Sequence, residues 1–245
     1  MASTSHVWLI TGCSAGFGIS IARTVLAHGH RVIASSRNPS KTPELVEEIA
    51  RLALKTVEKA QAIYGRLDVL VNNAGFAVLS ALENVDEITV KAEFETNVLV
   101  SSKSQRLCYQ SCETHAKELL STSASLELSS FGIRVLLVEP GAFRTNFLGH
   151  GAVSYQSPSE PYMGTAVEKT MQYLQAEHGT QPGDPRKAAE RIYEVVMGEG
   201  MAHNRKQYLR LVLGNKAYDT AQLKVDQLRE NFCALEDISK STDYS

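Results

Sequence analysis

The sequence predicts an α/β fold in which a parallel sheet carries helices on both faces, a doubly wound arrangement. Three observations support this prediction: short apolar runs alternate with helical segments, a glycine-rich turn follows the first run, and a long helical segment follows the last one. The chain has 245 residues, enough for one such domain, and no repeat or linker divides it. We therefore expect a single domain over residues 1–245.

The apolar runs and the helical periodicity place the elements along the chain. Strands are expected at residues 7–11, 31–35, 68–73, 133–138 and 208–213. Helices are expected at residues 19–28 and 43–64, through most of 87–130, and at 185–197 and 217–235. Asp184 suits the N-cap of the 185–197 helix, and Pro185 suits its first turn. The segment 149–161 is rich in Gly, Ser and Pro and is expected to be a polar loop.

Composition argues against several classes of function. Apolar residues make up 43% of the chain and charged residues 21%, which is ordinary for a globular protein. The net charge of −2 and the absence of a Lys/Arg run argue against a nucleic-acid partner. The sequence has no signal peptide and no apolar run of about 20 residues, so we expect a cytoplasmic protein without a membrane span. The four cysteines have no matching ligand pair, so no metal site is expected.

The turn TGCSAGFG, residues 11–18, is the first candidate binding site. Gly12, Gly16 and Gly18 follow the first expected strand and open the first expected helix. Glycines let the backbone turn tightly and approach a ligand, while a helix N-terminus offers unpaired N–H groups and a partial positive charge. This context favours a nucleotide pyrophosphate site over a purely structural turn.

Three further motifs follow in order: NNAG at residues 72–75, FETNV at 94–98 and EPGAFRT at 139–145. Together with the G-x-x-x-G-x-G spacing of the first turn, they resemble the short-chain dehydrogenase/reductase family. The C-terminal part resembles its hydroxysteroid- or retinol-dehydrogenase-like branch. The resemblance covers most of the chain and implies a Rossmann-like NAD(P)-binding domain. It also implies hydride transfer between a secondary alcohol and a ketone, with a substrate loop and lid within residues 146–206.

The family's motifs place candidate site residues on this sequence. The expected cofactor-binding residues are Gly12, Ser14, Gly16, Phe17, Gly18, Arg37, Asn72, Ala74, Gly75, Pro140, Gly141 and Thr145. Asn97 corresponds to the family's catalytic asparagine, which orders a proton-relay water. The loop 146–165 is expected to cover an apolar small-molecule substrate, and a packed surface loop is an equal alternative; its apolar and aromatic residues include Phe147, Tyr155, Tyr162 and Met163.

The end of the second expected strand bears on the choice of cofactor. An acidic residue there would bind the ribose 2′-hydroxyl of NAD and repel a 2′-phosphate, but the chain reads Ser35-Ser36-Arg37. Arg37 is suited to pair with that phosphate, with Ser36 beside it and Lys41 close in sequence. We therefore expect NADP(H) to be preferred over NAD(H). The alternative is that Arg37 is a solvated loop charge.

One part of the family's chemistry is missing from the sequence. The reaction uses a tyrosine as general acid/base and a lysine four residues later, which lowers the tyrosine pKa. None of the nine tyrosines has a lysine at that spacing. Tyr109 is nearest in context, but Glu113 occupies the lysine position, where a carboxylate would raise the tyrosine pKa. Gln110 and Thr114 are alternative occupants of the two positions, and Ser102 is a weak candidate for the catalytic serine.

The family's third and fifth strands also lack a counterpart. One long helix is expected between residues 37 and 68, and only eleven residues separate Asn97 from Tyr109. Loss of the central fifth strand would leave backbone groups unpaired or force its neighbours to pair directly. The helices through which relatives often form homo-oligomers flank this region, so that interface is expected to be altered. Three possibilities stay open: an impaired oxidoreductase, an inactive nucleotide-binding pseudo-enzyme or partner protein, and an unstable product of mis-splicing.

Overall fold

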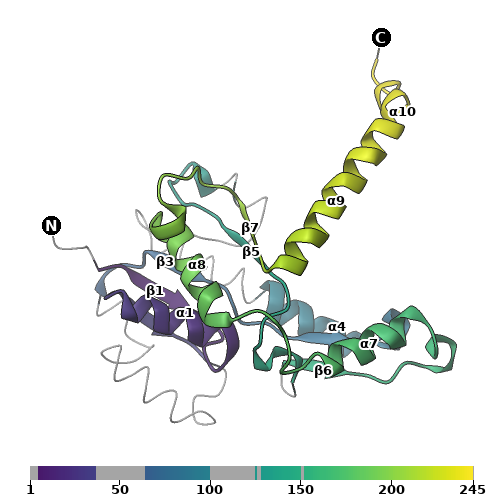
Figure 1. The fold of residues 1–245 in the computed structure, drawn as a ribbon, viewed down its shortest axis with the longest axis horizontal. Coiled ribbons are helices and arrows are strands. Elements are labelled where there is room, and N and C mark those ends of the chain that lie inside the picture. Colours follow the sequence, from purple (N-terminus) through teal and green to yellow (C-terminus); the bar gives the residue numbers. More distant parts are fainter. Residues whose placement is uncertain (1–4, 37–63, 100–124, 126–127, 150–151, 245) are drawn as a thin grey trace.

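The computed structural model describes residues 5–36, 64–99, 125, 128–149 and 152–244. Within these residues the chain is an α/β protein whose paired strands all run in parallel (Figure 1). The expected helix over 43–64, apart from its last residue, and most of the segment between 100 and 130 lie outside the described residues. The predicted fold class is confirmed.

The first sheet forms as predicted. β1 (Val7–Ile10), α1 (Gly16–Ala27) and β2 (Arg31–Ala34) follow one another, and β3 (Val69–Val71) pairs with the other edge of β1, giving the order β2-β1-β3. Trp8 in β1 is fully buried. A strand excluded from solvent on both faces is typical of a parallel sheet between helix layers.

Helix α8 (Pro185–Met197) packs against α1 and has the predicted bounds. Asp184 caps it by accepting a hydrogen bond from the N–H of Arg186 at 2.8 Å, and Gly198 ends it in the left-handed region. Its buried face shares one hydrophobic core with Trp8 and consists of Ala188, Ala189, Ile192 and Tyr193.

A second ladder contains β5 (Leu137–Pro140) and β7 (Arg210–Leu213). The strand predicted at 133–138 is wrong at its start, because pairing with β7 begins only at residue 137. The residues before it, including Ile133 and Val135, are buried but belong to no ladder in the described part of the chain. Within that part, no ladder joins β3 to β5 either. The break lies where the sequence predicts that a central strand is lost.

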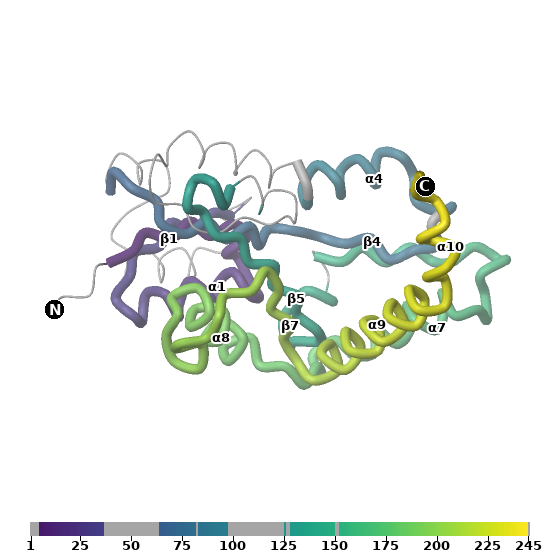
Figure 2. Tube along the Cα trace, turned by 90° about the horizontal axis from the view of Figure 1, so that it is seen from above, coloured from purple at the N-terminus to yellow at the C-terminus, as the bar shows by residue number. Residues whose placement is uncertain are grey.

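A third ladder was not expected from the sequence. β4 (Ala77–Leu79) pairs with β6 (Val153–Tyr155), so the prediction of a loop over 149–161 is partly wrong. Each strand has three residues, too few to show an alternating pattern. The helical elements around this ladder are η3 (Leu82–Asn84), α4 (Glu87–Phe94), η4 (Glu95–Leu99), η5 (Asn146–Leu148), η6 (Glu160–Tyr162) and α7 (Ala166–Ala176). Figure 2 shows β4, α4 and α7 at one end of the molecule, β1 and α1 at the other, and β5 and β7 between them.

The C-terminal part consists of η7 (Gly200–Ala202), strand β7, α9 (Asn215–Ala234) and α10 (Glu236–Lys240). Helix α9 starts directly after β7 and projects away from the body of the molecule (Figure 1). None of its residues is buried. Among the described residues, no helix has both the length and the apolar character that crossing a membrane requires.

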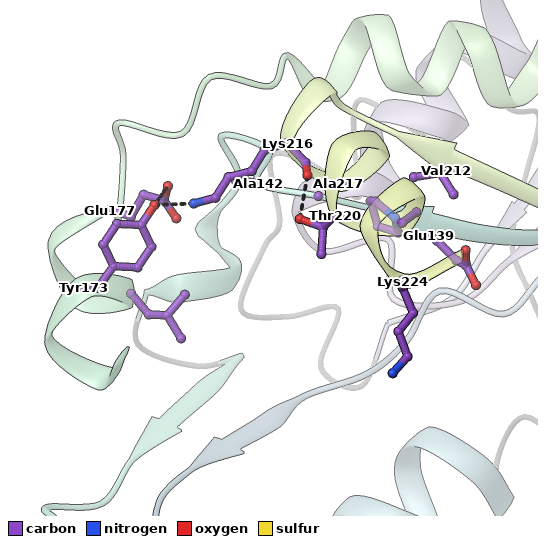
Figure 3. Close-up of a pocket in the computed structure, with 13 residues that line it drawn as sticks. Glu139, Ala142, Tyr173, Glu177, Val212, Lys216, Ala217, Thr220 and Lys224 are labelled. Atoms are coloured by element: carbon purple, nitrogen blue, oxygen red, sulfur yellow. Dashed lines mark hydrogen bonds between the residues drawn. The ribbon is translucent and has the colours of Figure 1, made fainter. Parts of the chain in front are cut away.

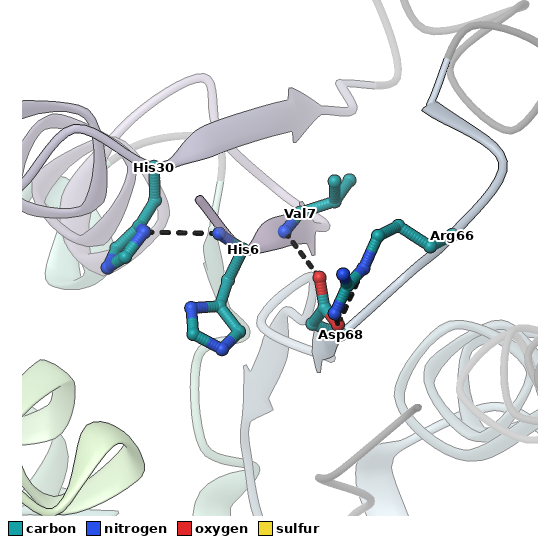
Figure 4. Close-up of polar contacts among 5 residues, drawn as sticks. All are labelled: His6, Val7, His30, Arg66 and Asp68. Carbon is teal, nitrogen blue, oxygen red and sulfur yellow. Dashed lines mark hydrogen bonds and ion pairs between the residues drawn. The ribbon is translucent and has the colours of Figure 1, made fainter. Parts of the chain in front are cut away.

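A polar cluster ties together the amino ends of the first three strands (Figure 4). Asp68 accepts a hydrogen bond from the N–H of Val7 at 2.8 Å and pairs with the guanidinium of Arg66. His30 Nδ1 accepts a hydrogen bond from the N–H of His6 at 3.2 Å. These contacts satisfy the buried Asp68 carboxylate at the end of the sheet opposite the glycine-rich turn.

Candidate cofactor site

The glycine-rich turn after β1 is too tightly packed for side chains at two of its positions. Gly12 has φ +69, and a Cβ atom there would lie 2.8 Å from Ala74 Cα. A Cβ atom at Gly18 would lie 2.4 Å from the carbonyl oxygen of Gly12. Only glycine leaves these contacts open. At these two positions the turn therefore consists of backbone without side chains.

Two residues that sequence reasoning did not single out hold the turn in place. The hydroxyl oxygen of Thr11 accepts hydrogen bonds from the N–H groups of Asn73 and Ala74, both at 3.0 Å. The amide nitrogen of Asn73 donates to the carbonyl of Thr11 at 2.9 Å and to that of Gly12 at 3.2 Å. The NNAG motif thus fastens the end of β3 to the turn after β1. Both residues belong to the motifs found in the sequence: Thr11 is the first residue of the TG pair, and Asn73 is the second residue of NNAG. The spacing of the motifs did not indicate what either residue does.

The N-terminus of α1 is suited to bind an anion. Its N-cap, Ala15, makes no side-chain cap, and its first turn holds no acidic residue. The first backbone N–H groups of a helix have no partner within the helix, and they carry a partial positive charge. Burial raises the pKa of the Cys13 thiol to about 12, so this side chain stays neutral and adds no negative charge to the turn. Ser14, also in the turn, is exposed.

The structure brings the EPGAFRT motif against this turn. A Cβ atom at Gly16 would lie 3.5 Å from Thr145 Cβ. The hydroxyl oxygen of Thr145 accepts a hydrogen bond from the N–H of Phe147 at 3.2 Å, which fixes its rotamer at the start of η5. The rings of Phe17 and Phe143 meet edge to face with centroids 5.2 Å apart. Residues far apart in sequence thus converge on one surface.

The Pro-Gly turn at the end of β5 lies beside a pocket. The N–H of Gly141 donates to the carbonyl of Leu213 at 2.9 Å, and a Cβ atom there would lie 2.8 Å from Ala217 Cβ. The pocket is lined by residues of this turn, α7 and the start of α9 (Figure 3). Within it, the Tyr173 hydroxyl accepts a hydrogen bond from Lys216 Nζ at 2.7 Å. Nothing in the sequence pattern indicated this pocket.

Asn97 is held against the segment that follows NNAG. Its Oδ1 accepts a hydrogen bond from the N–H of Phe76 at 3.1 Å, and its Nδ2 donates to the carbonyl of Phe76 at 2.8 Å. Oδ1 lies 3.2 Å from where a Cβ atom of Gly75 would be. Asn97 itself stands in η4, a turn of π-helix, which often marks functional sites. The structure therefore brings Asn97 to the end of β3, beside the expected cofactor residues.

The remaining predicted residues fall into two groups. Asn72 Nδ2 is buried and, within the described part of the chain, has no hydrogen-bond partner. Such an orphaned donor beside the turn fits a ligand that brings an acceptor. Arg37, Ser102 and Tyr109 lie outside the described residues, so the 2′-phosphate contact and the catalytic tyrosine and serine stay predictions.

The pKa values of two tyrosines in the expected substrate loop are raised. Burial raises the pKa of Tyr155, whose hydroxyl donates to the carbonyl of Leu148 at 3.2 Å. The Glu83 carboxylate raises the pKa of Tyr162. Both shifts oppose the phenolate that a general base requires. Phe147 and Met163 are largely exposed in this loop.

Comparisons with known proteins identify the family to which the chain is similar. A family model described as short chain dehydrogenase matches residues 6–111. The oxidoreductase BOA17 of Botryotinia fuckeliana is 30% identical over 260 residues, covering 89% of this chain and 92% of that protein. The oxidoreductase claN of Passalora fulva is 34% identical over 210 residues, covering 69% of this chain and 95% of that protein.

A solved short-chain dehydrogenase from Streptomyces avermitilis has the same fold, with a TM-score of 0.81 and 29% identity over 98% of this chain and 100% of that one. Together with the relatives, it shows that this chain belongs to the short-chain dehydrogenase/reductase family of oxidoreductases.

Proposed function

We propose that this chain binds NADP(H) at the β1–α1 turn and belongs functionally with reductases that interconvert a secondary alcohol and a ketone. The observation that carries the proposal is the position of Thr145 close to Gly16, at a helix N-terminus without a side-chain cap; a Cβ atom at Gly16 would lie 3.5 Å from Thr145 Cβ. An anionic pyrophosphate fits the bare backbone of the turn, and the orphaned Asn72 amide offers a further donor. The individual roles of the expected cofactor-binding residues are part of this proposal.

The bound dinucleotide would supply a hydride to a ketone or take one from an alcohol. The chain's own residues would do the rest. Gly12 and Gly18 allow the turn to pack closely against Ala74 and its own backbone, and Gly16 leaves room beside Thr145. Pro140 and Thr145 flank the place where the second half of the cofactor would lie, at the carboxyl ends of the strands. Asn97, fixed to the backbone of Phe76, would help to order water near the substrate.

Hydride transfer to a ketone also requires a proton at the carbonyl oxygen, and no described residue has been found to supply it. The sequence lacks a tyrosine with a lysine four residues later. Positioned acid/base groups contribute about 10²- to 10⁴-fold to such rates. We therefore propose that turnover by this chain is reduced by about that factor relative to an intact member of the family.

A second candidate function is a nucleotide-binding pseudo-enzyme or partner protein. The alignment with BOA17 spans 260 residues yet uses only 89% of this 245-residue chain, so parts of that relative have no counterpart here. Together with the break between β3 and β5 in the described part, this supports loss of a central segment. A chain with an intact phosphate cradle and no proton donor would bind cofactor without using it.

A fluorescence titration with NADPH and NADH tests the cofactor proposal. We expect tighter binding of NADPH, and Arg37→Glu should reverse the preference because a carboxylate repels the 2′-phosphate. NADH serves as the internal control, since it lacks that phosphate. Equal affinities for both cofactors in the unmodified chain would contradict the assignment of Arg37. Binding of neither, without a cooperative thermal transition, would identify an unstable product.

Turnover then separates the enzyme from the pseudo-enzyme. Glu113→Lys restores the tyrosine–lysine spacing with Tyr109, and the matched Glu113→Gln removes only the carboxylate. We expect the lysine variant to oxidise or reduce a panel of secondary alcohols and ketones faster than the glutamine variant. If neither the unmodified chain nor either variant turns over substrate, while all three bind NADPH normally, the result would favour the pseudo-enzyme.

A further inference from the structure

Helix α9 carries a regular apolar stripe. The apolar residues of this stripe, together with the C-cap Leu235, follow one another at alternating intervals of three and four: Tyr218, Ala221, Val225, Leu228, Phe232 and Leu235. Phe232 is 73% exposed and even the most covered large member, Leu228, is 41% exposed. Alternating spacings of three and four put every member on one seam of a helix, as in the a and d positions of a coiled coil.

No other part of the described chain covers this stripe. Helix α9 has no buried residue and projects from the body (Figure 1). A long exposed apolar surface on one side of a helix marks an interaction site.

We propose that two copies of this chain associate through α9, with the two helices antiparallel and overlapping over residues 218–235. In this register Tyr218 faces the partner's Leu235, and Val225 faces the partner's Leu228. Ala221 faces the partner's Phe232, so the smallest side chain of the stripe lies opposite its bulkiest apolar ring. The layer of Ala221 and Phe232 thus combines complementary volumes, as close packing requires.

The parallel arrangement fits less well. It would place Ala221 against the partner's Ala221 and Phe232 against the partner's Phe232, leaving one layer hollow and another overfilled. It would also bring Lys224 near the partner's Arg229, a repulsive pair. In the antiparallel register Lys224 lies beside the partner's Asn231 instead. Packing and charge therefore favour the same orientation.

The pocket next to α9 agrees with this arrangement. Ala221 belongs to both the stripe and the pocket, whose apolar wall includes Pro140, Leu174 and Ala217 (Figure 3). In the antiparallel dimer the partner's Phe232 lies over Ala221, at the edge of this wall. The helix is already formed in each copy, so association does not have to nucleate it. The interface does not use the segment between residues 100 and 124, and it does not depend on the proposed function.

Two variants of the full-length chain test the interface. Leu228→Lys places a charge on the stripe, whereas Leu223→Lys makes the same exchange at a leucine that is 64% exposed on another side of the same helix. Light scattering of the eluting protein should give twice the chain mass of 26.8 kDa for the unmodified protein and for Leu223→Lys, and the single mass for Leu228→Lys. Circular dichroism should be the same for all three, because both sites are exposed. A monomeric unmodified chain, dissociation by both variants, or a dimer that survives Leu228→Lys would each overturn the proposal.

Cysteine cross-linking tests the orientation. In a background where Cys108, Cys112 and Cys233 are each replaced by Ser and only the buried Cys13 is kept, chains with Ala221→Cys are mixed with differently tagged chains carrying Phe232→Cys and oxidised. The antiparallel dimer should give only the mixed disulfide. Its two Ala221 positions are eleven residues apart along the axis, about 16 Å, well beyond disulfide reach. A disulfide between two Ala221→Cys chains would show a parallel dimer and contradict the proposal.

Discussion

Replacing Gly18 by alanine tests whether the turn after β1 is a phosphate cradle. The new Cβ atom would lie 2.4 Å from the carbonyl oxygen of Gly12 and 2.7 Å from Asn73 Nδ2. Such atoms do not approach closer than about 3 Å, so the turn must open. Overpacking of this kind costs about 1–3 kcal/mol of stability. Losing one hydrogen bond from the turn to a charged phosphate costs about 1.5–3 kcal/mol, which is roughly a 10- to 150-fold rise in the NADPH dissociation constant.

The assay is a fluorescence titration with NADPH, accompanied by urea unfolding of the same preparation. Gly29→Ala is the control, because Gly29 lies after α1 with φ +80 and no atom within 4 Å of an added Cβ. Its left-handed backbone costs an alanine about 1–2 kcal/mol of stability but leaves the turn untouched. We expect only Gly18→Ala to weaken NADPH binding. Unchanged affinity in a folded Gly18→Ala protein would refute the assignment of the turn.

The polar cluster at the other end of the sheet gives two more predictions. Asp68→Ala should lower the free energy of unfolding in urea by about 1–3 kcal/mol, because the buried N–H of Val7 loses its acceptor, and should leave NADPH affinity unchanged; an unaltered urea midpoint would contradict this. Burial, followed by the charge on His6, lowers the pKa of His30 from 6.5. The unfolded chain then binds this proton more readily, so stability should be complete above pH 6.5 and fall as the pH drops below it. In His30→Gln the free energy of unfolding should depend less on pH below 6.5. An identical pH dependence in both proteins would rule out His30 as its source.

Elements that carry their own local signals were predictable from the sequence. The 185–197 helix was placed to the residue, and the sequence signals for it were Asp184 at the N-cap and Pro185 in the first turn. The β1–α1–β2 unit was also found, since its glycines can serve only a tight strand-to-helix turn. Gly18 illustrates this, because a Cβ atom there would meet the Gly12 carbonyl.

Elements that depend on a partner strand were not predictable. Strand β5 starts at Leu137 because β7 begins to pair there, although the apolar run starts earlier. Strands β4 and β6 form by pairing with each other, and neither has a sequence pattern that predicts a strand. In the site, the role of Asn73 arises from a hydrogen bond to Gly12, 61 residues away in sequence. Motif spacing identifies which segments belong to the site, but only the fold shows which of their atoms form hydrogen bonds with one another.

In the described part of the chain, side chains rather than backbone hydrogen bonds join the two main ladders. Trp8 of the first ladder and Leu213 of the second lie in one hydrophobic core, to which α8 contributes Ile192. Apolar packing is not directional, so it can join two ladders between which the described residues include no strand, whereas ladder hydrogen bonds need neighbouring strands. The shared core explains why Thr145, which follows the second ladder, lies close to Gly16, which follows the first. The turn after β1 therefore depends on parts of the chain that are separate from residues 100–124, where the catalytic tyrosine and serine are predicted.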